Sequence, residues 1–262
     1  MPTNKSLGQH WLRDRTALDD IVKFAGVNSN DAVLEIGPGL GTLTSAILRQ
    51  AKSVTAVEFD SELARKLPAQ FPGKNLEVIH SDILQFDLNQ LPKGYKVVAN
   101  LPYYITAKIV NHLISADNKP ASITILIQKE VAERIAQVDG NSILALAVEN
   151  QAMVELGKIV PPELFTPPPK VDSQVIRLDV RSTPLLNKNK EAAFFRVLKA
   201  AFSAKRKKIR SSLAGGLILD KKVIEQLLQR ANINPDIRAE RLTFSDFERL
   251  AEAYIYFNEG DY

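Results

Sequence analysis

The chain of 262 residues contains no cysteine, three histidines and a single tryptophan. The lack of cysteine excludes disulfides, thiolate metal ligands and a cysteine nucleophile. His10, His80 and His112 are far apart in the sequence, so we expect no histidine metal site. No apolar run approaches the roughly 20 residues that span a bilayer, and no apolar signal core follows the first residues. We therefore expect a cytoplasmic protein that binds neither metal nor membrane.

The composition is that of an ordinary globular protein, but its charge is distributed unevenly. Apolar residues make up 45% of the chain and charged residues 24%, which is enough for a sizeable core. Residues 1–182 carry 19 Lys and Arg against 20 Asp and Glu, whereas residues 183–262 carry 15 against 10. Residues 196–210, RVLKAAFSAKRKKIR, include seven basic residues and no acidic one. Such a run can be a solvated helix face, but its density favours a nucleic-acid backbone as the partner.

Short segments rich in β-branched residues alternate with helical patterns, which favours a parallel sheet covered by helices. Seven strands are predicted, at 32–36, 53–57, 76–80, 95–99, 122–127, 153–160 and 171–180. The last two flank a proline-rich loop too short for a crossover helix, so the last strand should pair antiparallel. Pro184 and residues 187–190 look like a linker, and only helical patterns follow them. We predict an α/β domain over residues 1–182 and a small, basic all-α domain over residues 183–262.

A glycine-rich turn, LEIGPGLGT, follows the first predicted strand. Glycine lets a backbone approach a ligand closely and adopt φ angles that other residues avoid. The turn falls at the carboxyl edge of the sheet, where open α/β folds bind ligands. A tight strand–helix connection explains it about equally well, and its spacing differs from that of dinucleotide-binding folds. Gly37 and Gly39 are the candidate ligand contacts.

Polar side chains lie at the ends of the next three predicted strands. Glu58 ends the second strand, where a carboxylate can accept hydrogen bonds from two ribose hydroxyls, and Asp82 follows the third, within reach of an adenine edge. Either acid alone could be a helix cap. Asn100 ends the fourth strand. Together with the glycine turn, these positions resemble the nucleoside-binding edge of Rossmann-like S-adenosylmethionine-dependent methyltransferases.

The sequence Asn-Leu-Pro-Tyr at the end of the fourth strand narrows the resemblance to enzymes that methylate the exocyclic amine of adenine. That amine is a poor nucleophile because its lone pair is delocalised into the ring. Acceptors on the Asn100 side chain and the Leu101 carbonyl can hold its two hydrogens and favour a pyramidal nitrogen. Pro102 keeps its predecessor extended, and Tyr103 offers a stacking face for a flipped-out base. The alternative is a turn with a core tyrosine, and we expect Tyr104 to be packed.

Over nearly its whole length the chain resembles the KsgA family, the small-subunit ribosomal RNA adenine N6,N6-dimethyltransferases. The matching motifs are SLGQHWL at 6–12, EIGPGLG at 35–41, NLPYYI at 100–105, FTPPPKVDS at 165–173, AFSAKRKKIRSSL at 201–213 and RAERL at 238–242. The resemblance implies a Rossmann-like methyltransferase sheet of seven strands, the last antiparallel, with S-adenosylmethionine as the methyl donor. It also implies that the N-terminal segment closes over the cofactor, although His10 replaces the usual Asn. Phe165 would stack on the target adenine opposite Tyr103; without the resemblance, a core anchor would be slightly favoured.

From the motifs and the resemblance we expect three groups of site residues. The expected cofactor contacts are His10, Leu12, Gly37, Gly39, Glu58, Asp82 and Asn100. The expected catalytic residues are Asn100, Leu101, Pro102, Tyr103 and Phe165. The expected RNA contacts are Lys205, Arg206, Lys207, Lys208 and Arg210.

The implied reaction transfers four methyl groups to N6 of two adjacent adenosines in the 3′-terminal hairpin of 16S rRNA, within an assembling small subunit. We expect the enzyme to act as a monomer. Two alternatives stay open. One is an Erm-type enzyme that dimethylates an adenosine of 23S rRNA, and the other is a non-catalytic nucleic-acid-binding protein on the same scaffold. The loop at 165–173 and the RAERL motif favour the small-subunit enzyme, and the intact Asn-Leu-Pro-Tyr argues against loss of activity.

Overall fold

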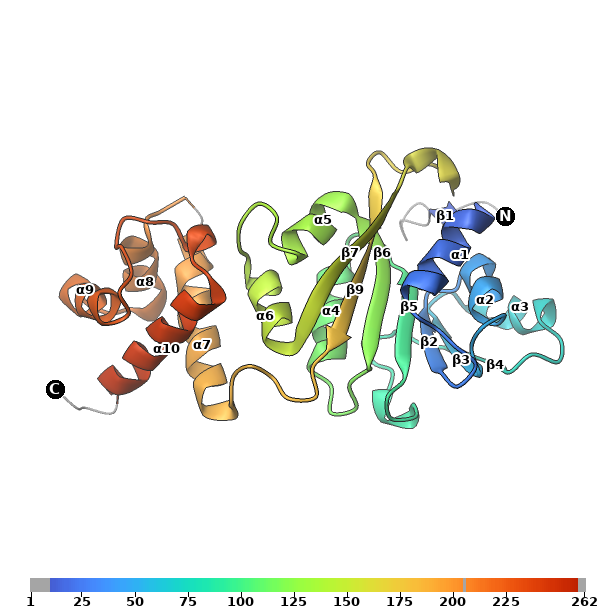
Figure 1. Cartoon of the computed structure of the whole chain (residues 1–262), viewed down its shortest axis with the longest axis horizontal. Coiled ribbons are helices and arrows are strands. Elements are labelled where there is room, and N and C mark those ends of the chain that lie inside the picture. Colours follow the sequence, from blue (N-terminus) through green and yellow to red (C-terminus); the bar gives the residue numbers. More distant parts are fainter. Residues whose placement is uncertain (1–9, 205, 259–262) are drawn as a thin grey trace. The chain divides into compact units, whose positions relative to one another are not determined.

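The computed structural model describes residues 10–204 and 206–258, which fall into two compact units (Figure 1). Unit 1 comprises the chain up to Ala136 together with Ala152–Ser182, and unit 2 comprises Gln137–Gln151 together with the chain from Thr183 onward. The expected boundary after residue 182 coincides with one break between the units. The segment 137–151, however, was expected in the first domain and belongs to unit 2, because Leu146 is buried in that unit's core.

Unit 1 is built on a seven-stranded sheet in the order β4-β3-β2-β5-β6-β9-β7. Its strands are β2 (Ala32–Ile36), β3 (Ser53–Glu58), β4 (Leu76–His80), β5 (Lys96–Asn100), β6 (Ser122–Gln128), β7 (Ala152–Val160) and β9 (Ser173–Val180). The last strand runs antiparallel to both of its neighbours, while the pairs from β4 to β6 are parallel. The predicted fold is therefore confirmed. The central strands are continuous apolar runs because both faces of a sheet of this kind are covered.

The helices of unit 1 are short, and each of them buries apolar side chains. They are α1 (Arg15–Phe24), α2 (Thr42–Ile47), α3 (Ser61–Lys66), α4 (Thr106–Ile114) and α5 (Lys129–Ile135), with single 3-10 turns at Pro68–Gln70, Leu88–Gln90 and Pro162–Leu164. Apolar side chains of α1 and α2 pack with those of the sheet in one cluster that includes Ile21, Ile47 and Val98. The helical patterns expected between the strands are present as helices.

A second, two-stranded sheet was not predicted. β1 (Trp11–Leu12) pairs antiparallel with β8 (Phe165–Thr166), so that Trp11 faces Thr166 and Leu12 faces Phe165. Two-residue strands carry no periodic signal, and the partners are more than 150 positions apart. This small sheet joins the N-terminal segment to the proline-rich loop.

Unit 2 is helical in the part that the structure describes. It contains α6 (Ile143–Gln151), α7 (Lys188–Ala201), α8 (Ile209–Leu217), α9 (Lys221–Arg230) and α10 (Phe244–Asn258), and 3-10 turns at Phe202–Ala204 and Ala239–Arg241. Its core holds the fully buried rings of Phe194 and Phe247. The predicted linker at 187–190 is wrong, because the Asn187 side chain accepts a hydrogen bond from the Lys190 N–H and begins α7 as its N-cap.

The described residues, 10–204 and 206–258, contain neither a membrane-spanning helix nor a metal-binding cluster. No helix among the described residues is long and apolar enough to cross a membrane. Within the same residues, no group of three or more His, Cys, Asp or Glu side chains could hold a metal ion.

Helices α7 and α8 approach each other closely at Gly216. A Cβ atom added there would lie 2.5 Å from the Ala200 Cα and 2.7 Å from the Ala200 carbonyl oxygen, which are backbone atoms that cannot move aside cheaply. At the preceding residue, Gly215, an added Cβ would meet no atom within 4 Å. Glycine is therefore required at one position of the pair and not at the other.

We expect Gly216→Ala to destabilise unit 2 by about 1–3 kcal/mol, because the helices must separate to admit the methyl group. Gly215→Ala is the matched control and should raise stability by up to about 1 kcal/mol, because alanine favours a helix interior. Urea unfolding followed by circular dichroism measures both. Equal effects of the two substitutions would contradict the close approach.

Candidate active site

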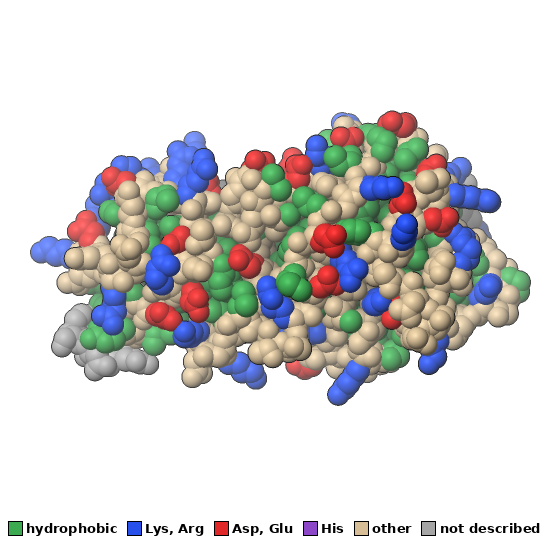
Figure 2. All heavy atoms as spheres, in the orientation of Figure 1, with side chains coloured by type: hydrophobic (Ala, Val, Ile, Leu, Met, Phe, Trp, Pro, Cys, Tyr) green, Lys and Arg blue, Asp and Glu red, His purple; other side chains and the backbone are tan. Residues whose placement is uncertain are grey.

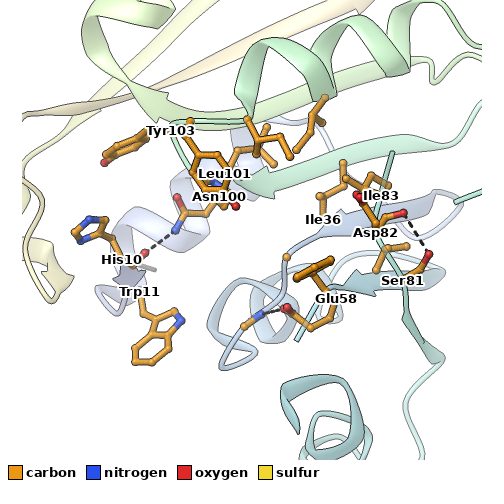
Figure 3. Close-up of a pocket in the computed structure, with 18 residues that line it drawn as sticks. His10, Trp11, Ile36, Glu58, Ser81, Asp82, Ile83, Asn100, Leu101 and Tyr103 are labelled. Carbon is orange, nitrogen blue, oxygen red and sulfur yellow. Dashed lines mark hydrogen bonds between the residues drawn. The ribbon is translucent and has the colours of Figure 1, made fainter. Parts of the chain in front are cut away.

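One cavity of unit 1 lies at the carboxyl ends of the parallel strands and has a volume of about 340 Å³ (Figure 3). Clefts of this size at this edge are typical small-molecule sites. Most of the predicted site residues line it, namely His10, Gly37, Gly39, Glu58, Asp82, Asn100, Leu101, Pro102 and Tyr103. Residues from four separate strand ends and from the N-terminal segment therefore meet around one space.

The glycines of the turn after β2 differ in their surroundings: some face the cavity, and one is packed against neighbouring side chains. Gly37, Gly39 and Gly41 have φ angles of 67°, 57° and 81°, which favour glycine. A Cβ at Gly37 would meet nothing within 4 Å, so the backbone is open to the cavity there. At Gly41 it would lie 2.7 Å from Leu67, so that glycine serves packing. Only the first part of the turn, at Gly37 and Gly39, thus lines the cavity and could contact a ligand.

Glu58, at the end of β3, holds the glycine turn in place. Its Oε2 accepts a hydrogen bond from the Gly39 N–H at 3.0 Å, and its Oε1 accepts one from the Asp60 N–H at 2.9 Å. Burial raises the pKa of Glu58, while the two N–H donors oppose the rise. Each carboxylate oxygen keeps a further lone pair. The same side chain can thus brace the turn and accept ligand hydroxyls.

The loop after β4 supplies a second acidic side chain, Asp82, to a part of the cavity that is lined by apolar residues. The Asp82 Oδ1 accepts a hydrogen bond from the Leu84 N–H at 2.9 Å, which fixes the loop after β4. Ile36, Val57 and Ile83 line the cavity nearby. An open glycine backbone, two carboxylates and apolar walls fit a nucleoside, and so they fit S-adenosylmethionine.

Asn100, at the end of β5, is held in one orientation. Its Nδ2 donates to the His10 carbonyl oxygen at 3.0 Å. A carbonyl oxygen only accepts, so the amide cannot be turned round, and its Oδ1 remains as an acceptor. In Figure 3 this oxygen points toward Tyr103 and away from the His10 carbonyl.

Tyr103 is fixed on the same side of the cavity. Its hydroxyl and the Ser173 Oγ share a hydrogen bond of 2.8 Å, and burial raises the pKa of the phenol. The phenol therefore stays neutral at physiological pH. A neutral ring beside an oriented amide oxygen is the arrangement expected for a base that stacks while its amine is held.

Three aromatic residues line the cavity without having been predicted as site residues. Trp11 lies against the glycine turn, since a Cβ on Gly39 would come within 3.1 Å of the indole Nε1. Phe59 is 62% exposed and Tyr104 is 68% exposed. The expectation that Tyr104 is packed is therefore wrong. Each of the three directly follows a predicted site residue in the sequence, and this position was the one feature that could have indicated them.

Two predicted site residues do not line this cavity. Leu12 and Phe165 are 1% and 3% exposed and face each other across the small sheet, where they join the core of unit 1. The burial of Phe165 in this core agrees with the core anchor that the sequence left open, and its stacking on the target adenine stays a prediction. A large apolar ring gains more from this dry contact than from an open cavity wall.

The basic run lies in unit 2, where Figure 2 shows Lys and Arg side chains over the connection between α7 and α8. Lys205 falls outside the described residues. Arg206 and Lys207 are exposed. Lys208 and Arg210 both pair with Asp236, at 3.3 Å and 3.1 Å, so their charge is partly compensated.

Comparison with known proteins identifies a family whose reaction uses the kind of cofactor that fits this cavity. A family model described as "Ribosomal RNA adenine dimethylase" matches residues 2–255. The chain belongs to this family. It is accordingly an rRNA adenine methyltransferase that takes its methyl groups from S-adenosylmethionine, and the resemblance noted in the sequence is confirmed.

Individual relatives support the assignment over nearly the whole chain. A "Ribosomal RNA small subunit methyltransferase A" from Dehalococcoides mccartyi (strain CBDB1) is 38% identical and covers 97% of this chain and 89% of its own. One of the same name from Clostridium botulinum (strain Loch Maree / Type A3) is 40% identical, covering 95% and 93%. Among solved structures, a dimethyladenosine transferase from Plasmodium falciparum has a TM-score of 0.79 at 28% identity, covering 95% and 98%. The 23S rRNA methyltransferase ErmE has 0.76 at 29%, covering 93% and 98%.

Beneath the glycine turn, Glu35 is a buried acid whose pKa is raised to about 8. Burial is the main cause, and the neighbouring charge of Glu58 adds to it. An unfolded glutamate has a pKa near 4.3. Between these two values the folded chain holds a proton that the unfolded chain has lost, so stability falls as the pH rises.

Glu35→Gln should remove this dependence, because the amide is neutral throughout. Relative to this variant, the wild-type free energy of unfolding should fall by on the order of 1 kcal/mol per unit between pH 5 and pH 8. Urea unfolding at several pH values measures the difference. Glu77→Gln, at an exposed acid on β4, is the control and should leave the wild-type profile unaltered. Parallel profiles for wild type and Glu35→Gln would contradict a protonated Glu35.

Proposed function

We propose that this chain dimethylates N6 of two adjacent adenosines in the 3′-terminal hairpin of 16S rRNA, and that it does so on an assembling small subunit. The observation that carries the proposal is the fixed Asn100 amide, whose free Oδ1 faces a cavity that fits the methyl donor. Relatives named for the small subunit, at 38% to 40% identity, supply the choice of RNA.

The residues of the cavity have complementary roles in this reaction. Asn100 Oδ1 and the Leu101 carbonyl accept the two hydrogens of the adenine amine and favour a pyramidal nitrogen. Tyr103 supports the base by stacking. When bound, S-adenosylmethionine supplies an electrophilic methyl group. Glu58 accepts its ribose hydroxyls, and Asp82 accepts from its adenine edge. No strong base is needed, because proton loss can follow methyl transfer.

Unit 2 is proposed to bind the rRNA. The chain from residue 183 onward carries 15 basic and 10 acidic residues. The exposed side chains of Arg206 and Lys207 offer charge for phosphate contacts. A single chain supplies all the residues of this mechanism, so we propose a monomer, acting in the cytoplasm.

A second candidate follows from the likeness to the 23S rRNA methyltransferase ErmE. The deciding experiment offers labelled S-adenosylmethionine and the protein to undermethylated small subunits, to naked 23S rRNA and to DNA, and then maps the methylated base. Dimethyladenosine at two adjacent positions of 16S rRNA supports the proposal. Label in 23S rRNA alone supports the second candidate instead.

Asn100→Ala should lower the rate of methyl transfer at least about 100-fold, because it removes an acceptor required at the reacting nitrogen. Affinity for S-adenosylmethionine should stay within a few fold of wild type. The fluorescence of Trp11, the single tryptophan, reports that affinity because its indole lies at the cavity. Turnover at the wild-type rate would refute the role of Asn100.

The double substitution Arg206→Gln and Lys207→Gln should weaken rRNA binding and lower its salt dependence. Each lost phosphate contact reduces the log–log slope by about 0.7 to 0.9, so the pair should reduce it by roughly 1.4 to 1.8. Asp236→Asn is a control of opposite sign, because it releases Lys208 and Arg210 from their ion pairs and should steepen the slope. Filter binding at several salt concentrations measures both, and an unaltered slope in the double variant would show a solvated face.

A further inference from the structure

A second cavity of unit 1 lies beside the active-site cavity. Its volume is about 430 Å³, and it lies between the start of α5 and the loop that leads into β9 (Figure 1). Five of its eight lining residues are charged and a sixth carries an amide, which distinguishes it from the partly apolar active-site cavity. The lining residues are Gln128, Lys129, Glu130, Glu133, Pro162, Lys170, Val171 and Asp172. A cavity of this size and polarity suits a hydrophilic ligand.

A single serine connects the walls of the two cavities. The Ser173 Oγ shares a hydrogen bond of 2.8 Å with the hydroxyl of Tyr103, which lines the active-site cavity. The residue before this serine is Asp172, which lines the second cavity. Ser173 also pairs with Gln128 across β6 and β9, and the Lys129 N–H donates to the Asp172 carbonyl oxygen at 3.0 Å. The two cavities are therefore neighbours at the same edge of the sheet.

The strand order leaves the second cavity on the side away from the cofactor contacts. The glycine turn, Glu58 and Asp82 belong to β2, β3 and the loop after β4, on one side of β5. The second cavity is built on β6 and β9, on the other side of β5. When the methyl donor occupies the first side, the second side remains for the RNA strand that brings an adenosine to Asn100.

We propose that the second cavity binds a guanosine that neighbours the target adenosine in the same RNA strand. The proposal rests on the proposed function, since it concerns the strand that the enzyme methylates. Two adjacent target adenosines require the enzyme to place one of them, and not its neighbour, at Asn100. A contact with a nearby guanosine would set that position along the strand.

The side chains without partners in this cavity indicate the base. Within the described residues, neither the Asp172 carboxylate nor the Gln128 side-chain amide makes a hydrogen bond. An ionised carboxylate only accepts hydrogen bonds. Guanine is the base whose Watson–Crick edge presents two N–H donors side by side, with a carbonyl oxygen next to them. Asp172 can accept from the two donors, and the Gln128 amide can donate to the oxygen, as in the recognition of unpaired RNA bases.

Lys170 supplies a charge for the phosphate of the same nucleotide. It is exposed, and it forms no ion pair within residues 10–204 and 206–258. The two glutamates of the cavity are paired with cations of α5, at 2.9 Å and 3.8 Å, which reduces their repulsion of a phosphate. The FTPPPKVDS motif thus places a phosphate contact and a base contact two residues apart.

Asp172→Asn tests the contact with the base. The substitution keeps the size of the side chain and the backbone carbonyl that accepts from Lys129, but it replaces one of the two acceptors with a donor. Glu163→Gln is the matched control, because Glu163 is an exposed acid of the same loop that does not line the cavity. Thermal unfolding verifies that each variant is folded.

The experiment measures single-turnover methyl transfer to undermethylated small subunits. Their 16S rRNA is either natural or carries inosine, which lacks the 2-amino group, in place of one guanosine within two positions of the target adenosines. A hydrogen bond to a charged group is worth about 10- to 150-fold. Asp172→Asn should lose rate in that range on natural subunits, and Glu163→Gln should match the wild type. At one inosine position the wild type should also lose rate, and Asp172→Asn should lose little more, because both changes remove the same contact.

Lys170→Gln is expected to add its effect to that of inosine, since it contacts the phosphate and not the base. Cofactor affinity, followed by Trp11 fluorescence, should be the same in all variants. A wild-type rate for Asp172→Asn, an equal loss in Glu163→Gln, additive losses of Asp172→Asn and inosine at every position, or a target without a guanosine in this range would overturn the proposal. If the wild type does not methylate small subunits, the proposed function fails, and the same comparison on the RNA that it does methylate decides the role of the cavity.

Discussion

The hydrogen bond from the Asn100 amide to the His10 carbonyl is the contact on which the site depends. It joins the end of a central strand to a segment 90 positions earlier in the chain. Without it, either end of the amide could face the cavity, and only the oxygen can accept from an amine. The bond therefore converts a common polar side chain into an acceptor of fixed direction, which is the condition for orienting a poor nucleophile.

That hydrogen bond holds only while the N-terminal segment stays in place, and the small sheet keeps it there. Leu12 and Phe165 are buried against each other in the core of unit 1, and Arg13 N–H donates to the Leu164 carbonyl at 3.2 Å. The proline-rich loop contributes again through Pro167, which accepts from His10. Apolar burial outside the cavity thus stabilises the orientation of the Asn100 amide, and the loop at 165–173 acts as a structural support for the N-terminal segment.

Sequence patterns predicted the parts of the fold that depend on local periodicity. The central strands are continuous apolar runs, and the polar residues that end them fall at one edge because the strands are parallel. Pairings between distant two-residue segments leave no such pattern, so β1 and β8 were missed. Helix α6 was assigned to the first domain because its sequence does not reveal which core receives Leu146. Whether Phe165 stacks or anchors depends on tertiary packing, which its motif does not encode.

The division of the site follows from the alternation of side chains along an extended chain. Trp11 faces Thr166 in register, which turns its indole toward the glycine turn and leaves His10 beside Tyr103. A shift of one residue in this pairing would exchange the two sides. It would place a small imidazole against the glycine turn, an indole against Tyr103, and Leu12 outside the core. The burial of Leu12 against Phe165 opposes that shift, so a hydrophobic contact of two side chains sets which ring lies against the glycine turn and which lies beside Tyr103.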